Sequence, residues 1–417
     1  MRRVLRTYFP ALPRSVATLQ VGGLVNSFGN GMTLPFMFIY LHNVRGIELA
    51  VAGLVIATHA VVSMVAGPVF GSQIDRFGGK TMLGLSLAIL ALGYASYPLV
   101  HEAWQGFVVA TVSGIGVGGF WPSQSTLIAA LTSPDERPAA FAMQRVVMNL
   151  GVGLGALAGG LIAATDSPGS FTTLFVVDAA TFVVYAGVML VLVPSPELDR
   201  EPHSSRVPGS YREVLRNRPF LAVIGLNALL IFAGYSGFDV LPVYAKNESG
   251  LTETQIGVLF FVNTVVIVLA QLPIARLGRG RRRMPMLALF AALWGGAWLL
   301  VPVAGAAVTS TAIWLLTAAM VVFAIGQCLH GAVYAPLVTD LANPRLLGRC
   351  MALSALSWQI GFALGPAIGG VALSVSPTGV WIGAALLCML GAVLALAIEA
   401  QVPDRARRTP IPVPASA

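Results

Sequence analysis

Long apolar segments, each about as long as a membrane-spanning helix, follow one another through almost the whole sequence. A helix needs about 20 mainly apolar residues to cross a bilayer. Twelve such segments can be marked, at 15–41, 48–71, 80–100, 105–131, 138–164, 170–194, 219–245, 253–275, 284–304, 309–339, 348–374 and 378–400. The sequence therefore predicts an all-α polytopic membrane protein with twelve transmembrane helices.

The scarcity of charge supports this prediction. Only 10% of the 417 residues are charged, against about 25% in ordinary soluble proteins. So few charges cannot cover the surfaces of the two or three soluble domains that a chain of this length would form. A soluble enzyme, a disordered chain and a nucleic-acid-binding protein therefore fit poorly. Three cysteines make no disulfide framework, and we expect no metal and no cofactor.

One connection differs from the others in length and composition. Residues 195–218 contain Pro, Ser, acids and five arginines, which is typical of a soluble linker. We therefore predict an N-terminal six-helix half at 1–194, a cytoplasmic linker at 195–218, a C-terminal six-helix half at 219–400 and a cytoplasmic tail at 401–417.

The basic residues predict how the chain is oriented in the membrane. Of the 25 Lys and Arg residues, 22 lie in the N-terminal region, the tail or the connections after even-numbered segments. Arg45 and Lys246 lie on the opposite side, and Arg145 lies inside segment five. Cytoplasmic connections carry such an excess of basic residues. We expect a multi-pass protein of the inner (plasma) membrane with both termini in the cytoplasm, and the net charge of +8 then reflects topology rather than nucleic-acid binding.

An internal repeat relates the two halves. Residues 131–160 and 341–370 are identical at eight of 30 positions at a constant offset of 210. A second similarity relates QIDRFGGK (73–80) to PIARLGRG (273–280) at an offset of 200. Both map the first half onto the second with the same membrane orientation. Parallel repeats of this kind are found in the major facilitator fold.

The segment GPVFGSQIDRFGGK (67–80) resembles the signature loop of the major facilitator superfamily, G-x-x-x-D-R-x-G-r-[RK]. It lies between the second and third segments, where the family carries it. Gly79 departs from the pattern at one basic position, and five residues match it: Gly71, Asp75, Arg76, Gly78 and Lys80.

A second motif points to one branch of that family. GVGLGALAGG (151–160) is similar to the helix-five motif of proton-coupled antiporters, G-x-x-x-G-P-x-x-G-G, with Ala156 in place of the proline. Arg145, Asn149 and Gly151 also follow the R-x-x-x-N-x-G pattern of the twelve-helix drug:proton antiporters of bacteria. The chain departs from this branch at Ala110, where the fourth-helix pattern has an arginine.

The resemblance implies roles for these residues. The carboxylate of Asp75 is expected to meet the N-terminus of helix eleven and close an inner gate; the alternative is a salt bridge that ends a helix. The glycines at 151, 155, 159 and 160 recur about every four residues, which predicts that they share one helical face, and the resemblance implies that this face packs against helix eight. They either shape alternating access or only permit close packing.

Few ionisable side chains lie within the segments. Asp178, Asp239, His59 and His330 are candidates for proton coupling, because a carrier must exchange its proton as its exposure alternates. Each of the four is otherwise a structural residue that caps, pairs or packs. Arg145 is placed to contact an anionic substrate or to respond to protonation of a nearby acid; the alternative is an interfacial arginine that extends toward the cytoplasm.

Uncharged polar and aromatic residues in the segments are candidates for lining a substrate cavity. Such a mixture suits amphipathic organic molecules, although some of these residues will only join helices by hydrogen bonds. Together with Arg145 the candidates are Asn26, Asn30, Trp121, Gln124, Asn149, Asn227, Tyr235, Asn263, Tyr334, Trp358 and Gln359.

The resemblance therefore predicts a secondary transporter that works as a monomer, as is usual for the fold, and that exchanges protons for a small amphipathic or lipophilic compound. No phosphate-binding loop supports ATP-driven transport. The alternatives are uptake or facilitated diffusion of a nutrient or metabolite, export of a siderophore or natural product, a polytopic membrane enzyme, and a transporter-like sensor. No clustered catalytic acids or histidines favour the enzyme.

Overall fold

The computed structural model describes residues 12–133, 135–195, 211–343 and 346–409. Most of the predicted linker and the end of the predicted tail lie outside these ranges. Six of the 22 basic residues used to predict the orientation also lie outside them, namely Arg2, Arg3, Arg6, Arg200, Arg206 and Arg345.

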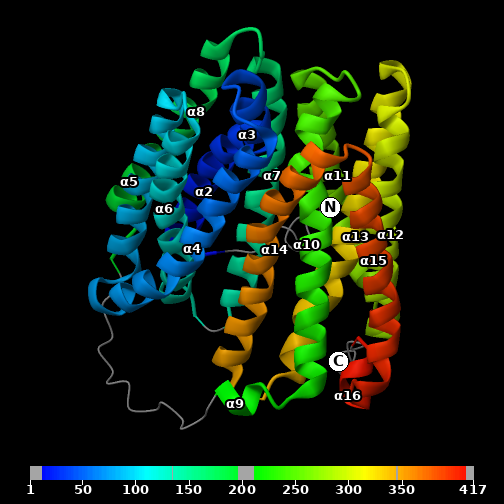
Figure 1. The fold of residues 1–417 in the computed structure, drawn as a ribbon. Coiled ribbons are helices and arrows are strands. Elements are labelled where there is room, and N and C mark those ends of the chain that lie inside the picture. Colours follow the sequence, from blue (N-terminus) through cyan, green and yellow to red (C-terminus); the bar gives the residue numbers. More distant parts are fainter. Residues whose placement is uncertain (1–11, 134, 196–210, 344–345, 410–417) are drawn as a thin grey trace, which may run out of the picture. The chain divides into compact units, whose positions relative to one another are not determined.

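The chain forms two compact units (Figure 1). Unit 1 comprises residues 1–200 and 251–264, and unit 2 comprises residues 201–250 and 265–417. The long helices of unit 1 are α2 (Arg14–Thr33), α4 (Leu49–Phe77), α5 (Gly79–Ser96), α6 (Ala103–Ala130), α7 (Arg137–Ile162) and α8 (Pro168–Leu192). Those of unit 2 are α10 (Arg218–Asn247), α12 (Arg283–Gly305), α13 (Thr309–Leu341), α14 (Leu347–Val375) and α15 (Gly379–Ile398). Helix α11 (Glu253–Leu277) begins in unit 1, and its later residues belong to unit 2.

Short helices complete the described chain, which contains no β-strand. They are η1 (Leu34–Phe36), α3 (Met37–Ile39), η2 (Tyr40–Val44), η3 (Tyr97–Leu99), α9 (Tyr211–Val214), η5 (Glu399–Gln401) and α16 (Asp404–Arg407). Eleven of the helices in the described part are long and apolar enough to cross a membrane. The predicted all-α polytopic fold is confirmed.

The first predicted segment, 15–41, is not one regular helix. Helix α2 ends at Thr33, and the chain continues through η1, α3 and η2. Pro35 lies in η1, and proline lacks the N–H that a regular helix needs and obstructs the preceding turn. The apolar pattern continues across this break because hydropathy does not register the missing donor.

The second predicted segment, 48–71, ends too early. Helix α4 continues to Phe77 and ends where Gly78 takes a φ of 82°, a conformation that glycine adopts readily. Gly71, Asp75 and Arg76 therefore lie on the last turns of a helix and not in a loop.

The sequence repeat corresponds to a repeated packing of helices. Helix α7 lies against α2 in unit 1, and α14 lies against α10 in unit 2. Glycines permit the close approach in both pairs, because a side chain at these positions would meet the backbone or side chains of the neighbouring helix. They are Gly151, Gly155 and Gly159 in α7 and, 210 positions later, Gly361, Gly365 and Gly369 in α14.

Candidate functional site

A carboxyl group is fully enclosed in unit 1. Asp178 of α8 has an exposed fraction of 0%. Its Oδ2 atom accepts a hydrogen bond of 2.7 Å from the hydroxyl of Thr33 at the end of α2, and Thr181 lies 3.4 Å from its Oδ1 atom. Within the described ranges no basic side chain forms an ion pair with Asp178. Hydroxyl groups, and not a cation, therefore surround this acid.

A glycine makes room for Asp178. A Cβ atom added at Gly29 of α2 would lie 2.6 Å from Oδ1 of Asp178. The backbone of α2 thus passes directly beside the carboxyl group of Asp178 on α8. This contact joins predicted segments one and six. Thr33 and Thr181 were not predicted as site residues. Thr181 could have been found, since it follows Asp178 by three positions on the same helical face.

Glutamines join three helices of unit 1. The amide of Gln124 on α6 donates to the hydroxyl of Tyr185 on α8 at 2.8 Å and accepts from Gln144 on α7 at 2.5 Å. Gln124 is buried. This geometry matches the interhelical alternative for Gln124, and Gln144 is a partner that sequence reasoning missed.

Other predicted residues of unit 1 are placed differently from one another. Asn26 is buried, and its Oδ1 atom has no hydrogen-bond partner within the described residues. Asn30 is half-buried, and Trp121 is exposed. Arg145 is exposed on α7, where its carbonyl oxygen accepts from Asn149 at 2.9 Å.

The helix-five glycines do not share one face. Gly151, Gly155 and Gly159 approach α2, whereas a Cβ atom at Gly160 would lie 2.6 Å from the carbonyl oxygen of Glu253 at the start of α11. Successive residues of a helix are turned by about 100°, so Gly160 cannot share the face of Gly159. Only Gly160 of the four meets predicted helix eight, and Thr254 donates to its carbonyl oxygen at 2.8 Å.

Unit 2 encloses a histidine in place of an acid. His330 of α13 places Nε2 at 2.8 Å from Oδ1 of Asn227 on α10, and the Asn227 amide donates to Ser357 of α14 at 2.8 Å. Because Asn227 uses its NH₂ group toward Ser357, its Oδ1 atom is the acceptor and Nε2 of His330 carries the proton. Tyr334 completes the cluster with hydrogen bonds to Ser354 at 2.9 Å and to Ser357 at 3.2 Å.

Aromatic rings surround this polar cluster. The ring of His330 stacks on Tyr334 at 4.9 Å and meets the edge of Trp358 at 5.3 Å. Tyr235 of α10 contacts Phe362 of α14 at 4.8 Å. Such edge-to-face and stacked rings form a specific apolar surface with a few polar groups.

Gln327 adds an acceptor that sequence reasoning did not single out. Its Nε2 atom lies 3.5 Å from the hydroxyl of Tyr235, and its Oε1 atom has no partner within the described residues. The sequence signal that could have identified Gln327 was the presence of a glutamine in an otherwise apolar helix. Five predicted residues therefore lie together in unit 2, namely Asn227, Tyr235, His330, Tyr334 and Trp358.

The remaining predicted residues do not join either cluster. His59 of α4 is half-buried, and its Nε2 atom has no partner in the described chain. Asp239 and Gln359 are half-buried on α10 and α14, and Asn263 is buried on α11. The described residues contain no group of acids, histidines and cysteines that could hold a metal ion.

The signature residues have distinct local partners. The ammonium group of Lys80 donates to the carbonyl oxygens of Leu190 at 3.0 Å and Val193 at 2.6 Å. These are carbonyls at the end of α8, which have no partner within their own helix, so Lys80 caps that helix. The guanidinium of Arg76 lies 5.1 Å from the ring centre of Phe77, and Asp75 is exposed.

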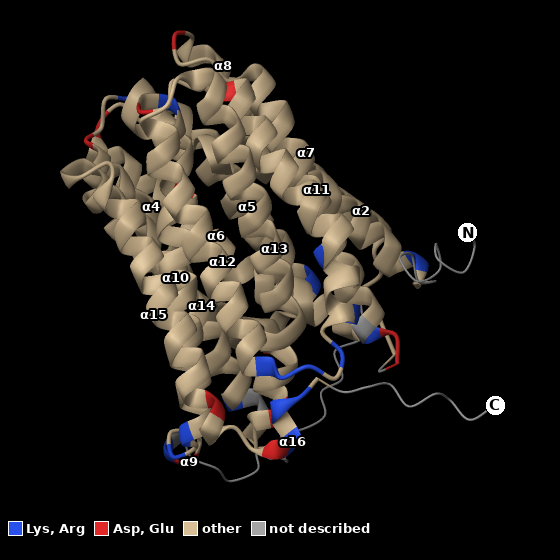
Figure 2. Cartoon of the chain, turned by 90° about the vertical axis from the view of Figure 1, so that its right-hand side faces the viewer, with Lys and Arg blue, Asp and Glu red and all other residues tan. Residues whose placement is uncertain are grey.

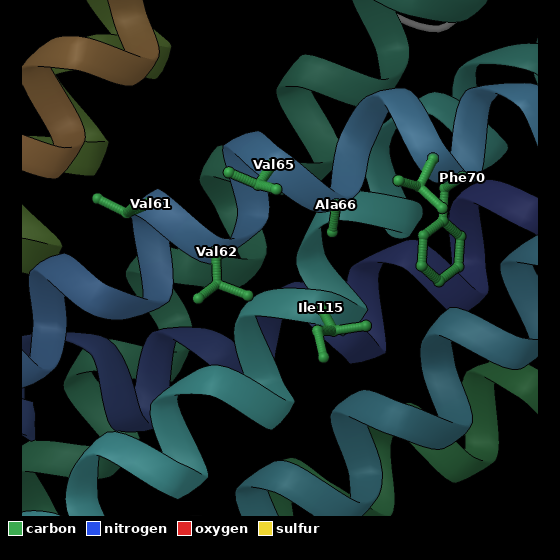
Figure 3. A pocket seen from close by; sticks show the side chains of 7 residues that line it. Val61, Val62, Val65, Ala66, Phe70 and Ile115 are labelled. Carbon is green, nitrogen blue, oxygen red and sulfur yellow. The ribbon is translucent and has the colours of Figure 1, made fainter.

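A groove of about 400 Å³ runs along α4 (Figure 3). It is lined only by apolar side chains, from Val61, Val62, Val65, Ala66, Val69 and Phe70 of α4 and Ile115 of α6. None of the predicted cavity residues lines it. Without polar groups to orient a ligand, the groove is not the candidate substrate site.

Comparison with protein families gives one match that spans most of the chain. The sequence profile of the Major Facilitator Superfamily matches residues 19–307 and 226–416. Similar proteins include the uncharacterized MFS-type transporter YqjV of Bacillus subtilis, which is 27% identical over 87% of both chains. The multidrug resistance protein MdtH of Cronobacter sakazakii is 27% identical over 84% of this chain and 85% of its own length.

Solved structures show the same fold at low identity. A POT family transporter in complex with 5-aminolevulinic acid has a TM-score of 0.80 and 13% identity, covering 95% of this chain and 98% of that chain. A bacterial homolog of the human lysosomal transporter Spinster has a TM-score of 0.73 and 14% identity at the same coverage. At such identities the likeness shows the fold alone.

Proposed function

This chain belongs to the Major Facilitator Superfamily and is a multi-pass membrane transporter, and on that premise we propose that it exports small amphipathic or lipophilic compounds in exchange for protons. Two features support the direction and the substrate class. Relatives of similar length are named multidrug resistance proteins, and the helix-five motif resembles that of antiporters. The expected location is the inner membrane, with both termini in the cytoplasm.

The enclosed carboxyl group of Asp178 carries the proposal. Among the acids that the structure describes, it is the one with no exposed surface, and only hydroxyl groups hold it. A buried charge without an ionic partner is costly. Proton exchange with either side then requires the helices beside it to change position, which is what coupling to alternating access demands. Asp239, His59 and His330 are the further candidates for this role.

The test uses purified protein in proteoliposomes with an imposed proton gradient and a fluorescent amphipathic compound. We expect the compound to move against its gradient only while the proton gradient lasts. Transport that continues unchanged after a protonophore collapses the gradient would exclude antiport. Transport in the opposite direction would favour the uptake alternative.

Asp178→Asn is the informative variant. The amide retains an oxygen that can accept from Thr33, so we expect a folded protein that still exchanges compound down a gradient but no longer couples to protons. Asp166→Asn is the matched control, because Asp166 is an exposed acid of the same unit. Proton-driven transport by Asp178→Asn at the rate of this control would remove Asp178 from the mechanism.

The gate proposed at Asp75 is tested in the same assay. Asp75→Asn removes the charge at the exposed end of α4 without changing the size of the side chain. We expect at least a tenfold loss of transport with normal expression, and normal transport would refute the gate.

Residues that contact substrate are proposed separately in each unit: Asn26 in unit 1, and the aromatic residues Tyr235, Trp358 and Phe362 in unit 2. Both regions contain an acceptor oxygen that lacks a partner in the described chain, on Asn26 and on Gln327. Asn26→Ala and Gln327→Ala should therefore raise KM for compounds with an N–H or O–H donor. Unchanged KM values for a series of such donors would exclude these two acceptors from substrate binding.

A further inference from the structure

A basic loop of unit 2 is held by the segment that follows the last long helix. The N–H of Gly280 donates to the carbonyl oxygen of Thr409 at 3.1 Å, and the N–H of Thr409 donates to that of Arg281 at 3.1 Å. Arg282 and Arg408 pair as an isolated antiparallel bridge. Figure 2 shows the basic segments of this region in blue beside α16. Residues 276–283 and 402–409 therefore form one ordered surface.

Arg283 is the buried anchor of this surface. It has an exposed fraction of 0%, its Nη1 atom lies 2.7 Å from Oδ2 of Asp340 on α13, and the same atom donates to the carbonyl oxygen of Ala406 at 3.3 Å. A buried guanidinium needs such partners to offset its lost hydration. One side chain thus ties together α12, α13 and α16.

The surface carries more positive charge than its acids balance. Three arginines have acidic partners: Arg282 with Glu399 at 2.6 Å, Arg283 with Asp340, and Arg407 with Asp404 at 2.8 Å. Five others are exposed, and within the described residues no carboxylate pairs with them. We call this set the basic platform; it consists of Arg276, Arg279, Arg281, Arg405 and Arg408.

The matching loop of unit 1 has no such surplus. Across the repeat, Asp75 corresponds to Ala275, and Lys80 corresponds to Gly280. The unit 1 loop therefore has one acid, Asp75, and two basic residues, Arg76 and Lys80. The unit 2 loop lacks the acid and has four additional arginines, at positions 279, 281, 282 and 283. The one ammonium group of the unit 1 loop is already used to cap α8. The surplus of positive charge is thus specific to the loop of unit 2, and the equivalent loop of unit 1 is built without it.

We propose that the basic platform binds the phosphate groups of anionic phospholipids, and that a lipid with two phosphates, such as cardiolipin, binds most tightly. The platform lies where membrane helices end, at Leu277 of α11, Arg283 of α12 and Ile398 of α15. Leu277 and Leu396 beside it are 66% and 53% exposed. Guanidinium groups next to exposed apolar side chains match a lipid, whose phosphate and acyl chains require both.

The test measures binding of fluorescent cardiolipin to the detergent-purified full chain, with phosphatidylcholine as the zwitterionic comparison. Each basic residue near a membrane surface changes affinity for anionic lipid about fivefold, so Arg279→Gln with Arg281→Gln should weaken cardiolipin binding about 25-fold. Raising the salt concentration should weaken the wild type in the same direction, because exposed charges are screened.

The matched control is Arg216→Gln with Arg218→Gln, which removes the same charge from exposed positions of unit 2 outside the platform. We expect it to bind cardiolipin within about twofold of wild type. Equal losses in both double variants, or equal binding of phosphatidylcholine, would overturn the proposal. Competition by inorganic phosphate or by an acidic peptide as strong as that by cardiolipin would overturn the assignment to lipid.

Discussion

The two units pack their helices in the same way but enclose different polar groups. In both, glycines spaced four apart let one helix approach another, α7 against α2 and α14 against α10. Beside these contacts, unit 1 encloses the carboxyl group of Asp178 between two threonines. Unit 2 encloses the imidazole of His330 in a network of an amide, two serines and a tyrosine.

This difference shows which part of a duplicated sequence the fold constrains. A glycine at a close backbone contact cannot be replaced without moving a helix, so both copies retain it. A polar side chain in the interior needs only a partner, and each copy has found its own. The shared glycines therefore describe the scaffold, and the unshared polar groups are where the two units can differ in function.

The largest expected effect comes from an alanine at Gly155. Its Cβ would collide with the carbonyl oxygen of Phe28 and lie 2.9 Å from Cα of Gly31, and overpacking against backbone costs up to about 3 kcal/mol. We expect Gly155→Ala to lose folded protein or fall several degrees in Tm in a thermal-shift measurement.

The equivalent change in unit 2 is the matched control. A Cβ atom at Gly365 would lie 3.2 Å from the backbone nitrogen of Ser236, a contact that a small helix shift relieves, and alanine favours a helix over glycine by about 1 kcal/mol. Gly365→Ala should thus change stability by less than about 1 kcal/mol. Equal losses in the two variants would show that the copies are equally tight.

The next effect separates the two enclosed polar groups. His330→Phe keeps an aromatic ring at this position but leaves the Asn227 oxygen without its donor, and an unsatisfied buried group costs about 1–3 kcal/mol. We expect His330→Phe to lower the Tm while transport is still driven by protons. Asp178→Asn should instead keep a normal Tm and lose the coupling of transport to protons. Loss of coupling in His330→Phe at a normal Tm would reverse the roles assigned to the two units.

A smaller effect is expected at Lys80, whose counterpart in unit 2 is the uncharged Gly280. Lys80→Met removes the charge that caps the end of α8, and such interactions contribute about 0.3–1 kcal/mol. The Tm should fall by a few degrees at most, and the loss should shrink at high salt. A large loss of transport at an unchanged Tm would show that Lys80 acts in the gate and not as a cap.

The smallest effect concerns the connection between α6 and α7. The backbone N–H and hydroxyl of Ser133, at 3.0 and 2.9 Å, lower the pKa of the Glu136 carboxyl. These hydrogen bonds therefore stabilise the folded state at pH values above the ordinary pKa of 4.5. This stabilisation is lost as the pH falls through the lowered pKa that Glu136 has in the folded state. The residue of unit 2 that is equivalent to Glu136, 210 positions later, is the buried Leu346.

The measurement is the difference in Tm between wild type and Glu136→Gln as a function of pH. We expect a small difference near neutral pH that disappears in acid. A difference that grows as the pH falls would contradict this account of Glu136.

Hydropathy predicted the helices well because nearly every one must be apolar for most of its length. It located the bounds poorly where single residues decide them. Pro35 breaks the first segment, and Gly78 rather than the last apolar residue ends α4. Charged residues on the final turn of α4 concealed its continuation, since hydropathy falls before the helix ends.

The interior partners could be predicted only in part. Asp178, Asn227, His330 and Tyr334 stand out in apolar segments by their polarity. Ser357 and Thr33 do not, because a hydroxyl group in a membrane helix commonly bonds to its own backbone, and no pattern tells which of them turns toward another helix. The sequence did not predict that Gly151, Gly155 and Gly159 face α2 whereas Gly160 faces α11. That prediction needs the angular position of Gly160 around the helix, which a spacing of about four residues does not resolve.

The contact between residues 278–283 and the segment after α15 also sets an order of assembly. The loop leaves the ribosome about 120 residues before Ala406 and Thr409, which follow every long helix described. Arg283 therefore enters its final surroundings only after the last of these helices has been made. Unit 2 cannot complete this corner during synthesis of its earlier helices, so a prematurely ended chain would reach the membrane with that corner open and with Arg283 lacking its contact to Ala406.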